Sequence, residues 1–235
     1  MQVNNTNNSI SFSSLRCPVK PFTMRSPKGL LYCSEIDYKQ SYSDKFYKDI
    51  GKFFLDIFAN TSSHPFWEKC RKSTLDIRVY DDYISSSVES YKKYFQQPDT
   101  TVLLIKDKKK HLVGALYTRS LDLNRVLKDD DTLYIDSLAV KPSYRGKNIG
   151  KKLLTKVLKA SKDRFSDAFL VAYKEAALFY EKLGFHKMNK NDSSCDFAIS
   201  ELAKERIDYP EYADFMEMKL DKKLPEDWFT RIKNK

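Results

Sequence analysis

Long apolar runs are missing from this chain of 235 residues, although 41% of its residues are hydrophobic and 31% are charged. No run of about 18 or more apolar residues occurs, so no membrane span is expected. The first part of the chain is polar and rich in Asn and Ser, without the apolar segment of a secretory signal peptide. These absences predict a globular protein of the cytoplasm with no membrane partner.

Cysteine and histidine are also scarce, and they are scattered. Cys17, Cys33, Cys70 and Cys195 form no C-x-x-C pair and no cluster with histidine. Structural metal sites and disulfide frameworks need such groupings, so we expect reduced thiols and no metal. Cys195 lies in a polar segment without a neighbouring base, which argues against a nucleophilic role.

Charge is abundant and unbalanced, with 42 Lys and Arg against 32 Asp and Glu, a formal net charge of +10. This balance favours anionic partners such as nucleic acids and phosphates. The lysines are nevertheless dispersed, and no arginine-rich block or RNA-binding signature is present. Part of the charge is solvated surface, and part would serve a phosphorylated cofactor.

The most informative stretch runs from Thr132 to Leu158. Its first part, up to Val140, is apolar and β-branched, as expected of a strand that ends at Lys141-Pro142. Its last part predicts an amphipathic helix, because one stripe is apolar and the other faces carry lysine. The apolar stripe consists of Ile149, Leu153, Leu154, Val157 and Leu158.

The junction between this strand and helix suits a phosphate or pyrophosphate. The first amides of a helix have no intrahelical partner, and the helix dipole is positive there. Gly146 and Gly150 allow close approach to the backbone, and Asn148 tolerates a left-handed conformation. Positive charge comes from Arg145, Lys147, Lys151 and Lys152. No Walker sequence and no G-x-G-x-x-G follows; the plain alternative is a strand-turn-helix with a solvated basic cap.

This junction resembles the acetyl-CoA-binding motif of the GNAT superfamily of N-acetyltransferases. The pattern of that motif is Arg or Gln, then any two residues, Gly, any one residue, and finally Gly or Ala. Arg145 and Gly150 match the ends of the motif, and Asn148 replaces the usual middle glycine. A second family motif follows at 179–185, FYEKLGF. The resemblance covers residues 101–187 closely and 31–220 loosely.

The resemblance implies an α/β fold with a mixed, mostly antiparallel sheet and helices on both faces. We expect this domain over residues 30–220, after a flexible leader at 1–29 and before a charged tail at 221–235. Apolar patterns predict strands at 30–36, 101–105, 112–117, 133–140, 168–172, 185–188 and 214–220. They predict helices at 43–59, 65–72, 81–97, 149–158, 175–183 and 197–206.

The resemblance also implies that acetyl-CoA is the co-substrate. In the family, strand backbone binds the pantetheine arm and polarises the acetyl carbonyl, and the loop and helix start bind the pyrophosphate. The corresponding residues here are Leu138, Ala139, Val140, Arg145, Gly146, Lys147, Asn148, Ile149, Gly150 and Lys151. Tyr173 stands where many relatives have an Asn that contacts the coenzyme, which is a second departure.

Two side chains are candidates for proton transfer. Asp136 is the candidate base, because several family members carry a carboxylate there and apolar burial would raise its pKa. The alternatives are an outward-facing Asp136, Glu35 as the base, or deprotonation through water. Tyr180 matches the family's tyrosine near the coenzyme sulfur and is the candidate acid; otherwise it is a core residue. His64, His111 and His186 have surface-like contexts.

We therefore expect transfer of an acetyl group to a primary amine by direct attack in a ternary complex. The acceptor would be a small molecule, a peptide or a protein, and the enzyme a monomer or homodimer. Two alternatives stay open: a GNAT-fold module that binds acyl-CoA without catalysis, and an acetyltransferase directed at RNA or the ribosome.

Overall fold

The computed structural model describes residues 18–61, 77–121, 132–189 and 213–220. Its centre is one eight-stranded sheet with the order β1-β2-β3-β4-β5-β6-β8-β7. Neighbouring strands are antiparallel, except that β5 and β6 are parallel. The strands are β1 Phe22–Ser26, β2 Gly29–Glu35, β3 Thr101–Lys106, β4 Leu112–Leu121, β5 Thr132–Val140, β6 Asp167–Tyr173, β7 His186–Lys187 and β8 Ala213–Lys219.

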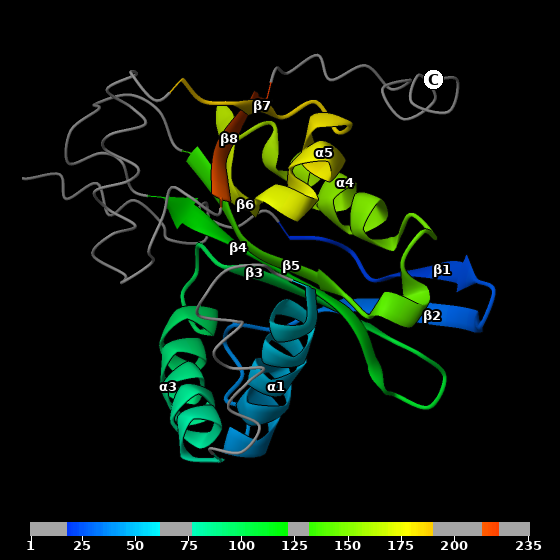
Figure 1. Ribbon diagram of the computed structural model, residues 1–235, viewed down its shortest axis with the longest axis vertical. Coiled ribbons are helices and arrows are strands. Elements are labelled where there is room, and N and C mark those ends of the chain that lie inside the picture. The colour runs from blue at the N-terminus through cyan, green and yellow to red at the C-terminus, as the bar shows by residue number, and fades with distance from the viewer. Residues whose placement is uncertain (1–17, 62–76, 122–131, 190–212, 221–235) are drawn as a thin grey trace, which may run out of the picture.

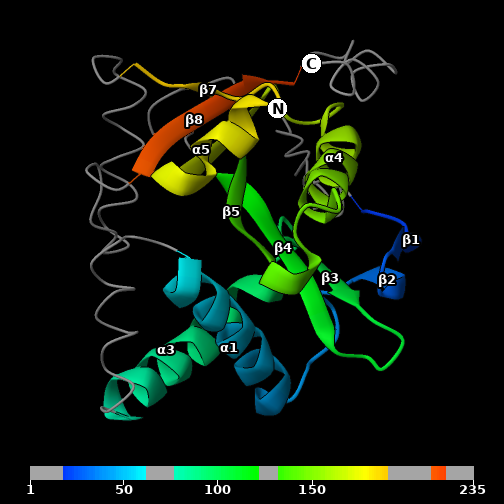
Figure 2. The same ribbon diagram turned by 45° about the vertical axis from the view of Figure 1, so that its right-hand side comes forward.

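Helices cover both faces of this sheet, which confirms the expected fold (Figure 1). α1 (Asp44–Thr61) and α3 (Ile77–Phe95) lie on one face, and α4 (Ile149–Ser161) and α5 (Lys174–Glu181) lie on the other. Figure 2 shows the same two layers from a second direction. No described helix has the length and apolar character needed to cross a membrane.

The core on the α1/α3 face is rich in aromatic side chains. α1 begins after Ser43, whose hydroxyl accepts a hydrogen bond of 3.3 Å from the Phe46 amide, as expected of an N-cap. The helix buries Tyr47, Ile50 and Phe54 against the sheet. From α3, Phe95 packs against Tyr117 of β4 with ring centroids 5.1 Å apart. Apolar stripes on both helices thus fix one wall of the molecule.

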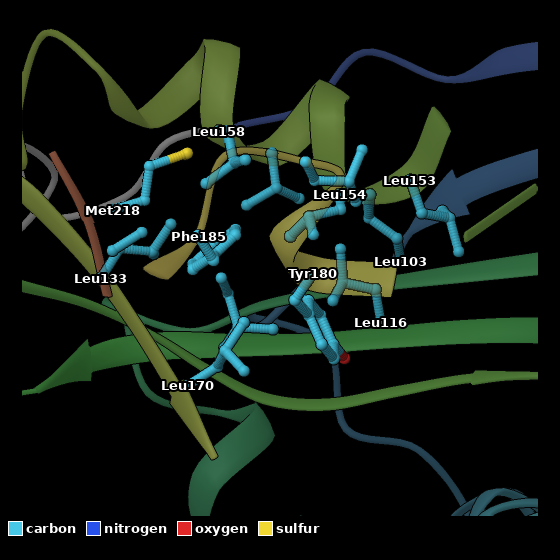
Figure 3. Close-up of a cluster of buried hydrophobic side chains, with 14 of the residues drawn as sticks. Leu103, Leu116, Leu133, Leu153, Leu154, Leu158, Leu170, Tyr180, Phe185 and Met218 are labelled. Carbon is cyan, nitrogen blue, oxygen red and sulfur yellow. The ribbon is translucent and has the colours of Figure 1, made fainter. Parts of the chain in front are cut away.

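The core on the α4/α5 face is mainly aliphatic (Figure 3). All five residues of the expected α4 stripe are buried, which confirms that interpretation of the sequence. From α5, Tyr180 points into the same core. The β5–α4–β6 unit therefore rests firmly on the sheet, and the loop before α4 is held at a defined edge.

The structure differs from the sequence-based expectation at residues 22–26. This part of the expected leader is strand β1, which pairs with β2 from Phe22↔Cys33 to Ser26↔Gly29. β1 forms because Met24 and the partly buried Phe22 join the core beside α4. The pairing also settles which face of β2 is buried: Leu31 and Cys33 are inside, whereas Tyr32 is 46% exposed.

Several sequence-based predictions fall outside the described residues. These are the leader at 1–17, the helices at 65–72 and 197–206, and the tail at 221–235, together with Cys17, His64, Cys70 and Cys195.

Candidate functional site

The two parallel strands in the middle of the sheet diverge. β5 pairs with β6 only as far as Ile135↔Leu170. Beyond that point β5 continues alongside β4 up to Val140, while β6 continues alongside β8 up to Tyr173. Among the described residues, the second half of β5 therefore has no strand paired on its β6 side, and an opening forms there.

A β-bulge marks the place where the strands part. The register between β4 and β5 jumps from Tyr117↔Ser137 to Thr118↔Ile135, so Asp136 is the extra residue. A bulge changes which side chains face which side of a sheet. Here Ile135 and Leu138 both belong to the core on the α4/α5 face, whereas Ala139 belongs to the other core.

The loop between β5 and α4 has the conformation expected from its sequence. It contains one short 3-10 turn, η3 (Pro142–Tyr144). Gly146 has φ +70°. Asn148 has φ 58° and ψ 19°, which confirms a left-handed residue at the N-cap of α4. The Arg145 side chain is tied to the loop, because its Nε donates a hydrogen bond of 3.1 Å to the Val140 carbonyl.

The start of α4 offers backbone donors to an anion. The first intrahelical bond runs from the Lys152 amide to the Asn148 carbonyl, at 2.9 Å. The amides of the residues between them lack intrahelical acceptors, and Asn148 makes no side-chain cap. A Cβ on Gly150 would lie 3.4 Å from Phe179 Cζ of α5, so glycine keeps this narrow point open. The donor set and the nearby cations fit a pyrophosphate.

A cavity of about 550 Å³ extends from this helix start between α4, α5 and the end of α1. Its volume lies in the usual range for small-ligand sites. Nine sequence-predicted residues line it: Leu138, Val140, Arg145, Gly146, Asn148, Ile149, Gly150, Lys151 and Tyr180. Asp136, Ala139 and Lys147 are not among the lining residues; the Ala139 side chain faces the opposite core.

The far end of the cavity is apolar and was not expected from the sequence. Ile57 and Phe58 reach it from α1, and the Tyr173 ring packs edge-on against Phe58, with centroids 6.2 Å apart. The α1 stripe indicated only that the helix packs on the sheet. No local pattern distinguishes residues at the end of such a stripe that also face a cavity.

Tyr180 lies along the cavity, and its side chain is only 8% exposed. Its ring packs edge-on against Phe179 and Phe185, at centroid distances of 5.0 and 5.9 Å. Burial raises the pKa of the Tyr180 phenol above its ordinary value. The hydroxyl therefore keeps its proton at neutral pH and can donate a hydrogen bond to a developing anion.

Asp136 lies on the α3 side of the sheet, in surroundings that differ from the apolar ones expected. Its Oδ2 is 3.5 Å from Arg119 Nε, and Ser137 Oγ donates a hydrogen bond of 3.0 Å to Oδ1. The Arg119 guanidinium lies over the rings of Tyr94 and Tyr134, 5.5 and 5.0 Å from their centroids. A neighbouring cation stabilises the carboxylate, so the sequence-based expectation of apolar burial is wrong for this side chain.

The remaining candidates are engaged elsewhere. Glu35 Oε2 accepts a hydrogen bond of 2.8 Å from the Val19 amide. His186 is exposed, with Nε2 3.2 Å from Glu217 Oε1. His111 lies 3.2 Å from Asp107 in a turn. Burial raises the pKa of the Cys33 thiol to about 12, so this cysteine stays protonated. None of these four lines the cavity.

Comparisons with solved structures agree with this fold. An acetyltransferase of the GNAT family from Staphylococcus aureus Mu50 is 19% identical, with a TM-score of 0.53 over 80% of this chain and 99% of its own. Escherichia coli ElaA is 14% identical, with a TM-score of 0.50 over 80% and 99%.

Sequence comparison gives the family directly. No curated protein matches the chain. The family model described as the acetyltransferase (GNAT) domain matches residues 68–197, which is more than half of the chain. This match spans the diverging strands, the loop with Asn148 and the helix with Tyr180. The chain belongs to the GNAT acetyltransferase family.

Proposed function

We propose that this protein transfers an acetyl group from acetyl-CoA to a primary amine by direct attack in a ternary complex. The observation that carries the proposal is the opening between β5 and β6, which leads from a basic helix start to a buried tyrosine. Membership of the family supports acetyl transfer in general. The acceptor class and the roles of individual residues are inferred from the site.

The residues at the start of α4 would hold the pyrophosphate. Backbone amides after Asn148 supply donors, and Arg145 and Lys151 supply charge. The edge of β5 that faces β6 would bind the pantetheine arm through Leu138, Ala139 and Val140. Acetyl-CoA supplies a thioester, which reacts with a neutral amine and releases a thiolate.

Asp136 would accept the proton of the acceptor amine, directly or through water. An amine with a pKa near 10.4 is neutral in only about one molecule in 10³–10⁴ at pH 7, so a base is valuable. Arg119 and Ser137 fix the orientation of this carboxylate. The amine nitrogen then forms a bond to the acetyl carbon as the carbon–sulfur bond breaks. Tyr180 would donate its proton to the departing sulfur.

A thiol-release assay tests this proposal. Acetyl-CoA is mixed with the purified protein and a panel of amines, peptides and RNAs, and free thiol is measured over time. We expect thiol release that depends on one class of amine and appears together with an acetylated product. Binding of acetyl-CoA without turnover of any acceptor would instead favour a non-catalytic acyl-CoA-binding module.

A further inference from the structure

Positive charge is concentrated in two segments of the chain. Residues 141–162 contain eight lysines and arginines and no Asp or Glu. Residues 18–34 contain Lys20, Arg25 and Lys28, again without an acidic residue. The whole chain has a net charge of +10, so these two segments hold as much excess charge as the entire protein.

The fold brings the two segments together. β1 lies beside α4 in both views (Figures 1 and 2). Lys156 Nζ of α4 lies 5.4 Å from the centre of the Phe22 ring of β1. Lys28, in the turn after β1, lies 4.8 Å from the centre of the Tyr144 ring in the loop before α4. We call the exposed cations Lys20, Arg25, Lys28, Lys152 and Lys156 the basic surface.

These cations differ from four lysines on other elements that lie beside carboxylates. No carboxylate of the described residues lies within ion-pair distance of any member of the basic surface. On other elements, by contrast, Lys45, Lys92, Lys187 and Lys219 lie 3.1, 2.9, 3.0 and 2.9 Å from carboxylates. Uncompensated like charges repel each other, and a polyanion would remove that repulsion.

The cofactor proposed above does not account for this surface. The cations that line the cavity are Arg145, Lys151 and Lys182, and no member of the basic surface is among them. Lys152 and Lys156 lie one turn apart on the outside of α4, about 6 Å along the helix axis. The charge therefore continues away from the cavity, along α4 and onto the β1–β2 hairpin.

We propose that the basic surface binds the phosphate backbone of a single-stranded RNA. The surface turns from a helix over a loop onto a hairpin, and a flexible single strand can follow such a path, whereas duplex DNA is stiff over about 150 base pairs. Its two aromatic rings, Phe22 and Tyr144, lie under lysines instead of being open to bases. If the protein contacts the phosphate backbone without stacking on bases, the RNA affinity should depend strongly on salt and little on the RNA sequence.

Fluorescence anisotropy with a labelled single-stranded RNA tests the proposal. The variant carries Lys20→Gln, Arg25→Gln and Lys156→Gln; the matched control carries Lys48→Gln, Lys52→Gln and Lys93→Gln on α1 and α3. A plot of log affinity against log salt falls with increasing salt, and loss of three phosphate contacts should make that slope less steep by about 2. We expect at least a tenfold loss of RNA affinity at low salt for the variant, and less than threefold for the control.

Other outcomes would overturn this assignment. The unmodified protein could fail to bind RNA at low salt, or the two triple variants could lose RNA affinity equally. Tighter binding to duplex DNA or to phosphatidylserine vesicles than to RNA would also contradict the assignment. Acetyl-CoA affinity, measured by calorimetry, should change less than threefold in the variant. The RNA result is independent of turnover, so a failed acetyl-transfer assay would leave it unaffected.

Discussion

The two faces of the sheet are built from the sequence in different ways. On the α4/α5 face, the diverging strand, the loop with Asn148 and the helix start form one continuous stretch from β5 into α4. On the α1/α3 face, the charged cluster joins Tyr94 of α3, Arg119 of β4 and Asp136 of β5. A continuous site can be recognised from local spacing, whereas a site assembled from distant elements depends on the completed fold.

Their electrostatics differ as well. The five cations of the basic surface have no carboxylate within ion-pair distance among the described residues, which suits an anionic partner. Arg119 on the other face is 15% exposed and lies near a carboxylate and two aromatic rings. That arrangement holds the Arg119 guanidinium and the Asp136 carboxylate in a fixed relation to each other.

The largest effect is expected from Asp136→Asn, which keeps the shape of the side chain but cannot accept a proton. If Asp136 is the base, turnover should fall about 10²-fold, and the loss should shrink as pH rises because more acceptor is neutral. The melting temperature checks folding. An unchanged rate across pH would assign deprotonation to another group or to water.

Arg145→Glu tests the opposite face. A carboxylate facing the phosphates should weaken acetyl-CoA binding at least tenfold, about 1.4 kcal/mol or more. Lys162→Glu, at the other end of α4, is the matched control and should leave affinity nearly unchanged. Calorimetry on both variants gives the comparison, and equal affinities would remove Arg145 from the coenzyme site.

Substitutions of Asn148 test the loop conformation. A β-branched residue strongly disfavours a φ of 58°, so Asn148→Val should disturb the loop and reduce acetyl-CoA affinity severalfold. Asn148→Gly removes the side chain and suits that φ, so affinity should hold or improve. The same calorimetric titration separates the two; identical affinities would mean that binding does not use this geometry.

Tyr180→Phe removes only a hydroxyl. Turnover should fall severalfold while coenzyme affinity changes little, because the thiolate leaves fairly well unaided. Burial raises the pKa of the phenol, so its contribution to stability is present below pH about 10 and is lost as pH rises toward the folded-state pKa. Alkaline unfolding monitored by circular dichroism should therefore begin at higher pH in the variant than in the wild type.

Tyr117→Phe is the counterpart on the α3 face and should have the smallest effect. The Tyr117 hydroxyl is buried without a hydrogen-bond partner among the described residues. Removing it should change the free energy of unfolding by less than about 1 kcal/mol, or stabilise the protein. Chemical denaturation measures this; a loss of more than about 2 kcal/mol would reveal a polar contact of that hydroxyl.

Local patterns predicted the α4 stripe, the left-handed Asn148 and most strands. They could not predict the surroundings of Asp136, because Arg119 and Tyr94 reach it through strand register and helix packing. They also missed β1, since its pairing with β2 depends on apolar contacts with α4. The sequence also did not predict that Ile57 and Phe58 line the cavity, because a residue that faces a cavity has the same helical spacing as one that packs on the sheet.

Side chains along a strand point alternately to the two sides of the sheet, and the extra residue in β5 interrupts that alternation. One inserted position directs a carboxylate to one side of the sheet and returns Leu138 and Val140 to the other side, where they line the cavity. Deleting Asp136 would close the ladder with β4, because the Ile135↔Thr118 pair would be followed directly by Ser137↔Tyr117. Leu138 and Val140 would keep the side on which they line the cavity, so the carboxylate can be removed without turning the rest of the strand over.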